Sequence, residues 1–175
     1  GRYIATAGED TTVRLWDAGT GDELVLFTGH TEAVNAVVFS QDGRYLLTGS
    51  DDTTARMWNI ATGQESRIFK GHAREVLSVA FTPTLEYIVT GSDSNARMFS
   101  VVTGLEFRQF TGHADRVRSV AVSPDGRFLL TASSDRTARL WDIKTAQQVR
   151  LFSGHTDLIR SAAFSADGTT VLTGS

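Results

Sequence analysis

Apolar residues along this chain fall into short runs separated by turns, and no stretch follows the period of a helix. In residues 34–39, two valines three positions apart precede a phenylalanine, and a turn of sequence SQDG follows at 40–43. Because the three-residue step breaks strict alternation, we predict a strand with a β-bulge near its start. Residues 45–47 are continuously apolar, which predicts a second strand that is buried on both faces.

Two further strands complete the pattern. Residues 54–58, TARMW, predict a third strand, and residues 65–69, ESRIF, predict a fourth after a Thr-Gly turn at 62–63. The fourth strand carries more charge, as an outer edge needs in order to resist pairing with other molecules. Four antiparallel strands in each unit of about 42 residues predict one blade of a β-propeller.

The same unit recurs along the whole chain, at steps of 41 or 42 residues. This period predicts complete blades at 29–70, 71–111 and 112–153, a partial blade at 1–28 without its innermost strand, and two strands at 154–175. The chain starts inside one repeat and stops inside another, so we interpret it as a segment of a longer protein. The recurring pairs are Gly29-His30, Gly71-His72, Gly112-His113 and Gly154-His155, then Trp16-Asp17, Trp58-Asn59, Phe99-Ser100 and Trp141-Asp142.

These pairs at this spacing resemble the WD-repeat (WD40) family, and the resemblance covers all 175 residues. It implies an all-β WD40-type β-propeller segment of about four four-stranded antiparallel blades, three complete and two partial. Members of the family form a ring of blades, most often seven, around a central channel. The resemblance also implies a buried, hydrogen-bonded tetrad of His, Ser or Thr, Asp and Trp in each blade. On this chain the tetrads would be His30, Ser50, Asp52 and Trp58, and His113, Ser133, Asp135 and Trp141.

The blade predicted at 71–111 departs from this pattern. Phe99 stands in place of tryptophan and removes the indole N–H, and the second turn is one residue shorter, with Asp93 alone where other repeats have two residues. The first repeat has Gly8 in the serine position. Because an unpaired buried polar group costs about 1–3 kcal/mol, we expect 71–111 to be the loosest complete blade.

An arginine precedes each residue in the tryptophan position by two places. We expect it on the outward face of the third strand, paired with acidic groups across the sheet. A nucleic-acid-binding stripe is the alternative, but a net charge of −3 argues against a general surface for nucleic acid or anionic membrane. The four residues are Arg14, Arg56, Arg97 and Arg139.

The chemistry of the chain indicates a protein that is not an enzyme. Cysteine is absent, which excludes disulfides, thiolate ligands and a cysteine nucleophile, and which fits the reducing cytoplasm that we predict as its location. The four histidines stand one per blade, so we predict no metal site and no cofactor. No nucleophile elbow or phosphate-binding glycine motif occurs, and the tetrad side chains would saturate one another. No apolar run approaches the roughly 18 residues of a membrane helix.

The positions three and five residues after each histidine should line one mouth of the channel, a face with which this family commonly contacts partners. Arg116, Arg118 and Arg160 would form a basic sector there for an acidic or phosphorylated peptide, since arginine forks suit carboxylate and phosphate. Charged residues that bind nothing are the open alternative. The candidate partner-binding residues are Asn35, Glu75, Leu77, Arg116, Arg118 and Arg160.

The sequence therefore predicts a scaffold that binds other proteins or peptides across the propeller face. The alternative is part of a ligand-binding or catalytic propeller whose chemistry lies in other parts of the protein or in an appended domain. A ring of seven blades cannot close with 175 residues, so we expect further repeats of the same protein to complete it. The alternative is that the open ends expose apolar surface that drives oligomerisation or aggregation.

Overall fold

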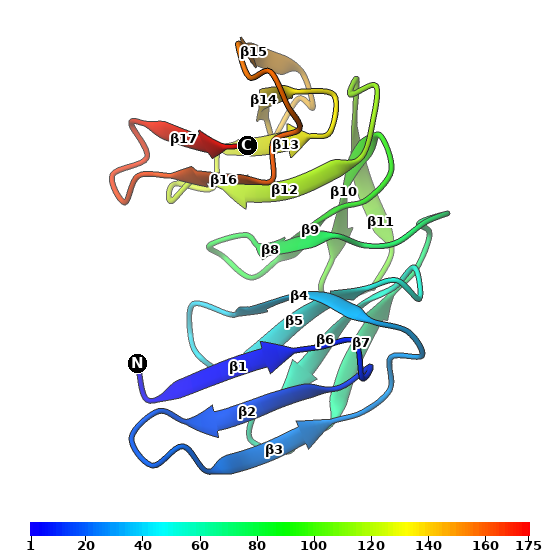
Figure 1. Ribbon diagram of the computed structural model, residues 1–175, viewed down its shortest axis with the longest axis vertical. Coiled ribbons are helices and arrows are strands. Elements are labelled where there is room, and N and C mark those ends of the chain that lie inside the picture. Colours follow the sequence, from blue (N-terminus) through cyan, green and yellow to red (C-terminus); the bar gives the residue numbers. More distant parts are fainter.

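The computed structural model describes residues 1–175, which form five antiparallel sheets and no helix. The sheets follow one another along the long axis of the molecule, and no strand joins the first to the last (Figure 1). We call them blades 1 to 5; the all-β propeller segment predicted above is confirmed. Blade 1 contains β1 (Tyr3–Ala7), β2 (Val13–Asp17) and β3 (Glu23–Phe27); blade 2 contains β4 (Val34–Phe39), β5 (Tyr45–Ser50), β6 (Ala55–Asn59) and β7 (Glu65–Phe69); blade 3 contains β8 (Ser78–Phe81), β9 (Tyr87–Gly91), β10 (Asn95–Ser100) and β11 (Glu106–Thr111); blade 4 contains β12 (Val117–Val122), β13 (Phe128–Ser133), β14 (Thr137–Asp142) and β15 (Gln148–Ser153); blade 5 contains β16 (Ser161–Phe164) and β17 (Val171–Gly174).

The first strands of blades 2 to 5 lie side by side. Strand β4 contacts β8, β8 contacts β12, and β12 contacts β16, whereas β7, β11 and β15 lie farther out (Figure 1). These first strands therefore form the inner wall of an open arc. We call the end of the blades at which the inner strands begin the rim face.

The predicted β-bulge lies at the rim face of two blades. The register between β4 and β5 shifts between Val34 and Ala36, and the register between β12 and β13 shifts between Val117 and Ser119. The extra residues are Asn35 and Arg118, both of which belong to the predicted partner-binding set. A bulge turns its extra side chain out of the ladder, so the backbone sets the direction of these two side chains.

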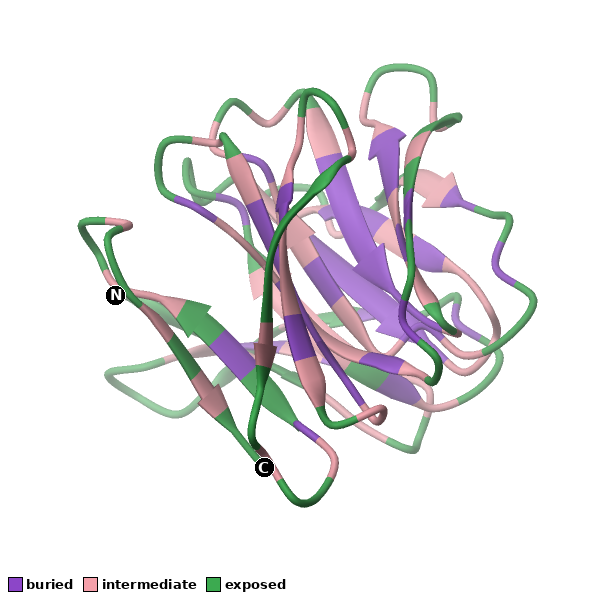
Figure 2. Ribbon diagram, turned by 90° about the horizontal axis from the view of Figure 1, so that it is seen from above, coloured by how far each residue is buried: buried purple, intermediate pink, exposed green.

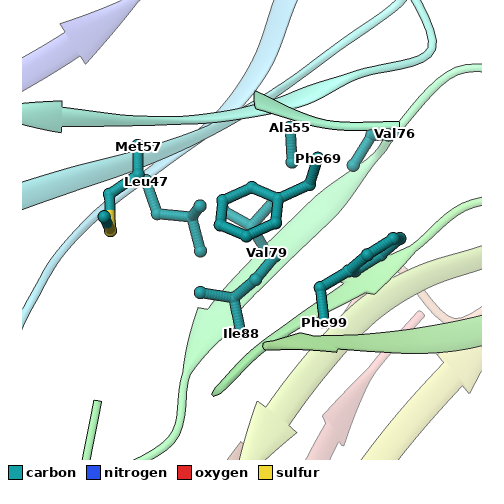
Figure 3. Packing of buried hydrophobic residues seen from close by; sticks show 8 residues of the cluster. All are labelled: Leu47, Ala55, Met57, Phe69, Val76, Val79, Ile88 and Phe99. Carbon is teal, nitrogen blue, oxygen red and sulfur yellow. The ribbon is translucent and has the colours of Figure 1, made fainter. Parts of the chain in front are cut away.

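Adjacent blades are held together by apolar side chains from the middle strands. Leu46 packs with blade 1 and Leu47 packs with blade 3, and both are completely buried. The continuous apolar run therefore serves two interfaces at once, as predicted for a strand buried on both faces. Figure 3 shows the interface between blades 2 and 3, where Phe69 lies between Leu47 and Phe99. Buried residues concentrate along the middle of the sheets, and the turns at both ends are exposed (Figure 2).

Candidate functional site

A chain of buried hydrogen bonds crosses blade 2. Trp58 Nε1 donates to Thr48 Oγ1 at 3.0 Å, and Thr48 Oγ1 lies 2.8 Å from His30 Nε2. The other ring nitrogen, Nδ1, lies 2.7 Å from Asp52 Oδ2. Burial lowers the pKa of His30, so the imidazole is neutral, donates from Nδ1 to the carboxylate and accepts the threonine proton at Nε2. Every polar group in the chain is thereby paired.

Blade 4 contains the same chain. Trp141 Nε1 donates to Thr131 Oγ1 at 2.9 Å, and His113 lies 2.8 Å from both Thr131 Oγ1 and Asp135 Oδ2. Burial alone would raise the pKa of Asp135, but hydrogen bonds from Thr137, the Ala114 amide and His113 outweigh it and hold that pKa below its usual value. The carboxylate therefore stays charged and fixes the histidine.

The hydroxyl group in these chains belongs to Thr48 and Thr131, so the assignment of Ser50 and Ser133 was wrong. Ser50 Oγ instead accepts from the Asp52 amide at 3.1 Å and donates to the Glu32 carbonyl, and Ser133 acts in the same way. Serine and threonine lie two residues apart on one face of the strand, but the indole N–H reaches only the threonine, which is the nearer of the two to the residue paired with the tryptophan. A sequence signal existed, because a threonine stands two places before the serine position in every repeat, at Thr6, Thr48, Thr90, Thr131 and Thr173.

Blade 3 carries only part of the chain. His72 Nε2 lies 2.7 Å from Thr90 Oγ1, but its Nδ1 is buried without a partner. Asp93 points toward Arg74, with Oδ1 3.5 Å from the arginine Nε, and the ring of Phe99 packs 5.9 Å from the imidazole. Burial lowers the pKa of His72 to about 4. The lower stability predicted for this blade stays a prediction, and these contacts give it a physical basis.

Three of the four arginines before the tryptophan position pair with a glutamate of the outermost strand, as predicted, and the fourth pairs with a neutral side chain. Arg56 Nη1 lies 2.6 Å from Glu65 Oε2, and Arg97 Nη1 lies 2.7 Å from Glu106 Oε2. Arg14 and Glu23 form the same pair in blade 1, and Arg139 donates to the Gln148 side chain in blade 4. These guanidinium groups are therefore engaged in the sheet.

The rim face contains the predicted partner-binding residues, but several of them are paired with one another. Asn35 Nδ2 donates to Asp51 Oδ1 at 2.6 Å and to the Val76 carbonyl of blade 3 at 3.2 Å. Glu75 Oε1 lies 2.7 Å from Arg116 Nη1 and joins blade 3 to blade 4. Leu77 is half-buried. Much of this face therefore links blades as well as facing solvent.

The expected basic sector of three arginines needs correction. The Glu75 carboxylate neutralises Arg116, which leaves Arg118 and Arg160 as its unneutralised members. Arg118 Nε donates to Ser134 Oγ at 2.6 Å, and this bond holds the side chain while its two Nη groups stay free of protein acceptors. Arg160 occupies the equivalent repeat position in blade 5, directly before β16, and is exposed. The sector is therefore smaller than predicted.

A polar hollow of about 370 Å³ lies beside this sector, between blades 3 and 4. Arg74, Asp93 and Ser94 border it from blade 3, and Asp115 and Arg116 border it from blade 4. The shortened turn of blade 3 contributes two of these residues. Opposite charges balance within the hollow, so it does not enlarge the basic sector.

The structure contains neither a metal-binding cluster nor a membrane-spanning helix. No group of three or more histidine, aspartate and glutamate side chains is placed to hold a metal ion. No helix has the length and apolar character that a membrane crossing requires.

Comparison with known proteins agrees with this architecture. The family model described as "WD domain, G-beta repeat" matches residues 1–17, 21–59, 63–100, 104–142 and 146–175. The chain is similar to the nuclear distribution protein PAC1-2 of Postia placenta, with 42% identity over 43 residues, which are 25% of this chain and 10% of that protein. It is also similar to the probable E3 ubiquitin ligase complex SCF subunit sconB of Penicillium rubens, with 53% identity over 36 residues, 21% of this chain and 5% of that protein.

A third relative is the WD40 repeat-containing protein HOS15 of Arabidopsis thaliana, with 48% identity over 40 residues, 23% of this chain and 6% of that protein. Each alignment spans about one repeat and a tenth or less of the relative's length. The likeness therefore lies in the repeat unit, and the family model matches that unit along nearly the whole chain. This chain belongs to the WD40 repeat family.

Proposed function

We propose that this protein is a non-catalytic interaction scaffold that binds an acidic or phosphorylated peptide at the rim face, with Arg118 and Arg160 contacting the anion. The family to which the chain belongs indicates a scaffold, and the name of the sconB relative describes that protein as a subunit of an SCF complex. Absent cysteine fits the cytoplasm, which we propose as the compartment.

One observation carries the proposal: Arg118 near the start of β12 and Arg160 directly before β16 occupy equivalent repeat positions in adjacent blades and have no acidic partner, whereas Arg116 beside them has one. Arginine forks bind carboxylate and phosphate in two-pronged geometry. Because Ser134 already fixes Arg118 through Nε, little side-chain entropy is lost when its Nη groups bind a ligand.

The buried histidine chains support a non-catalytic role. His30 and His113 are saturated by threonine and aspartate on both ring nitrogens, so neither ring nitrogen is available as a general base at a substrate site. Ser50 and Ser133 hold turns and are buried, so neither offers a free nucleophile.

The test is binding to an array of acidic and phosphorylated peptides, compared between the protein and the charge-reversed variant R118E/R160E. We expect the variant to lose at least about tenfold in affinity for the best peptide, with a marked salt dependence in the unaltered protein. Arg136, in the exposed β13–β14 turn, provides the matched control R136E, which should bind normally. Equal binding by R118E/R160E and the unaltered protein would remove the proposal.

A further inference from the structure

A cavity of about 620 Å³ opens between blades 1 and 2. It lies at the end of the blades opposite the rim face, because Ile60 and Ala61 in its wall belong to the turn that follows β6, and β6 runs away from the rim. Val25 of β3 and the side chains of Tyr3 and Tyr45 also line it. We propose that this cavity binds an arginine side chain of a partner polypeptide.

Val25 occupies a position in the outermost strand of blade 1 that can be compared directly between blades. Val25 pairs with Leu15 across the outer two strands. At the same register position, blade 2 has Arg67 opposite Met57, and blade 3 has Arg108 opposite Met98. Valine therefore stands where the next two blades have an arginine.

At the junction of blades 3 and 4, the arginine reaches the neighbouring blade. Arg108 Nη1 donates to the Ile143 carbonyl at 2.6 Å and also to the Lys144 carbonyl, in the turn after β14. Its guanidinium carbon lies 5.1 Å from the centre of the Phe107 ring. The turn and an aromatic ring together hold one guanidinium group.

At the junction of blades 2 and 3, Arg67 also lies on the equivalent turn. A Cβ atom added to Gly104 would be only 2.9 Å from Arg67 Cδ, so the arginine stem covers the glycine backbone. Both junctions are thus filled by an arginine of the preceding blade.

Val25 is too short to do the same. It reaches the turn at Gly63, where an added Cβ would lie 3.2 Å from Val25 Cγ1, and it ends there. The residues equivalent to Ile143 and Lys144 are Ile60 and Ala61, and no group of the chain donates a hydrogen bond to their carbonyl oxygens. The cavity therefore has carbonyl groups equivalent to those that accept from Arg108 at the junction of blades 3 and 4, but it has no arginine that donates to them.

The walls suit the rest of an arginine side chain. Leu15 and Val25 present apolar surface for its methylene groups. Tyr3 and Tyr45 add aromatic rings to the wall, and the Tyr3 ring already attracts a guanidinium group, that of Arg2, whose carbon lies 5.5 Å from the ring centre. A guanidinium brought by another polypeptide would meet the same kinds of group that surround Arg108.

Arg44 is the one charged residue in the cavity wall. Its counterpart at the junction of blades 3 and 4 is Arg127, which coexists with Arg108. Arg127 lies over the Phe128 ring at 4.8 Å, and its Nε is 3.8 Å from Asp142 Oδ2. Arg44 is similarly turned toward Asp42, at 4.0 Å. The junction of blades 3 and 4 thus accommodates two guanidinium groups, one of them paired with Asp142; at the cavity Asn59 stands in the place of Asp142, and Asp42 is the acidic partner of Arg44.

The test is an NMR titration of the protein with N-acetyl-arginine amide, read at the Val25 methyl groups and the Ala61 amide. Because hydrogen bonds from a charged donor are stronger than those from a neutral one, we expect saturable shifts with arginine and at least about tenfold weaker binding of the neutral isostere N-acetyl-citrulline amide. Equal binding of the two compounds would overturn the proposal and leave only a nonspecific apolar cleft.

Two reciprocal substitutions sharpen the test. V25R places the chain's own arginine in the cavity, as in blades 2 and 3, and should abolish the shifts. R67V empties the next junction and should create a second set of saturable shifts at the Val102 amide. Retained binding by folded V25R, or no new site in R67V, would each overturn the proposal, and R67V keeps it testable if V25R does not fold.

The rim variant R118E/R160E separates this inference from the proposed function. It should bind N-acetyl-arginine amide as the unaltered protein does, because the cavity lies at the opposite end of the blades. Loss of arginine binding in that variant would count against the cavity as the site, whereas loss of acidic-peptide binding alone concerns only the rim.

Discussion

Gly49 of blade 2 lies directly against Val79 of blade 3, so closely that a Cβ atom added to the glycine would be 2.9 Å from Val79 Cγ1. Such an atom would also be 2.7 Å from Val76 Cγ1. At the junction of blades 4 and 5 the equivalent residues are Ala132 and Ala162, both buried. A glycine in one blade therefore faces a valine in the next, and an alanine faces an alanine, so the two side chains share a fixed space.

This relationship predicts that G49A destabilises the protein by about 1–3 kcal/mol, because the added methyl group overfills the interface. The double substitution G49A/V79A reproduces the alanine pair of blades 4 and 5. Its cost should be smaller than the sum of the single costs, by at least about 0.5 kcal/mol, in a double-mutant cycle measured by urea unfolding. Strict additivity would show that the two residues do not compete for space.

The hydroxyl group of the buried chain in blade 2 can be identified by substitution. T48V removes the partner of both Trp58 Nε1 and His30 Nε2 while keeping the side-chain shape, and should cost about 2–4 kcal/mol in the free energy of unfolding. S50A removes hydrogen bonds only at the turn and should cost about 1 kcal/mol. A larger cost for S50A than for T48V would show that the serine, and not the threonine, is the hydroxyl group of the buried hydrogen-bond chain.

Blade 3 should become more stable when the missing indole is introduced by substitution of Phe99. At Gly29, an added Cβ would lie 3.0 Å from Trp58 Cη2, whereas at Gly71 no Phe99 atom lies within 4 Å, so space exists for a larger ring. F99W would let an indole N–H donate to Thr90, and we expect a gain of about 1 kcal/mol in urea unfolding. The reverse change in blade 2, W58F, serves as the control and should destabilise. A loss of stability in F99W would mean that the ring does not fit.

His72 should make the protein sensitive to acid. Its pKa is about 4 in the folded state against 6.5 as the ordinary value, so below pH 6.5 the unfolded chain binds a proton that the folded chain does not. Stability therefore falls as the pH drops from about 6.5 to about 4, by about 3 kcal/mol in total. Burial lowers the pKa values of His30 and His113 as well, and these residues act in the same direction.

The measurement is urea unfolding at pH 7.5 and pH 4.5, compared with H72L. The variant cannot take up the proton, so its loss on acidification should be smaller by about 2 kcal/mol. An equal loss in both proteins would show that His72 is protonated without cost in the folded state.

The features that could be predicted from the sequence are those set by local periodicity. The bulge at Asn35, the two-faced position of Leu46 and Leu47, and the pairing of Arg56 with a charged outer strand each follow from a few consecutive residues. The pair between Glu75 and Arg116 was not predicted, because it joins residues 41 positions apart whose side chains meet only when blades stack.

The threonine of the buried chain was missed for a different reason. Thr48 and Ser50 have the same chemistry on the same face, and only their heights relative to Trp58 distinguish them. The cavity beside Val25 was also invisible, since a valine in a strand is unremarkable until Arg67 and Arg108 are seen at the same place. Both cases depend on distances between strands, which sequence spacing does not contain.

The incomplete chain of blade 3 has a consequence for how the protein comes apart. Each blade touches only its neighbours, so cooperativity passes along the row from one interface to the next. With its unpaired imidazole nitrogen in the middle of that row, blade 3 is the complete blade in which we expect a local opening to cost least. Partial unfolding should therefore divide the chain into two halves that melt as separate cooperative units, blades 1 and 2 on one side and blades 4 and 5 on the other.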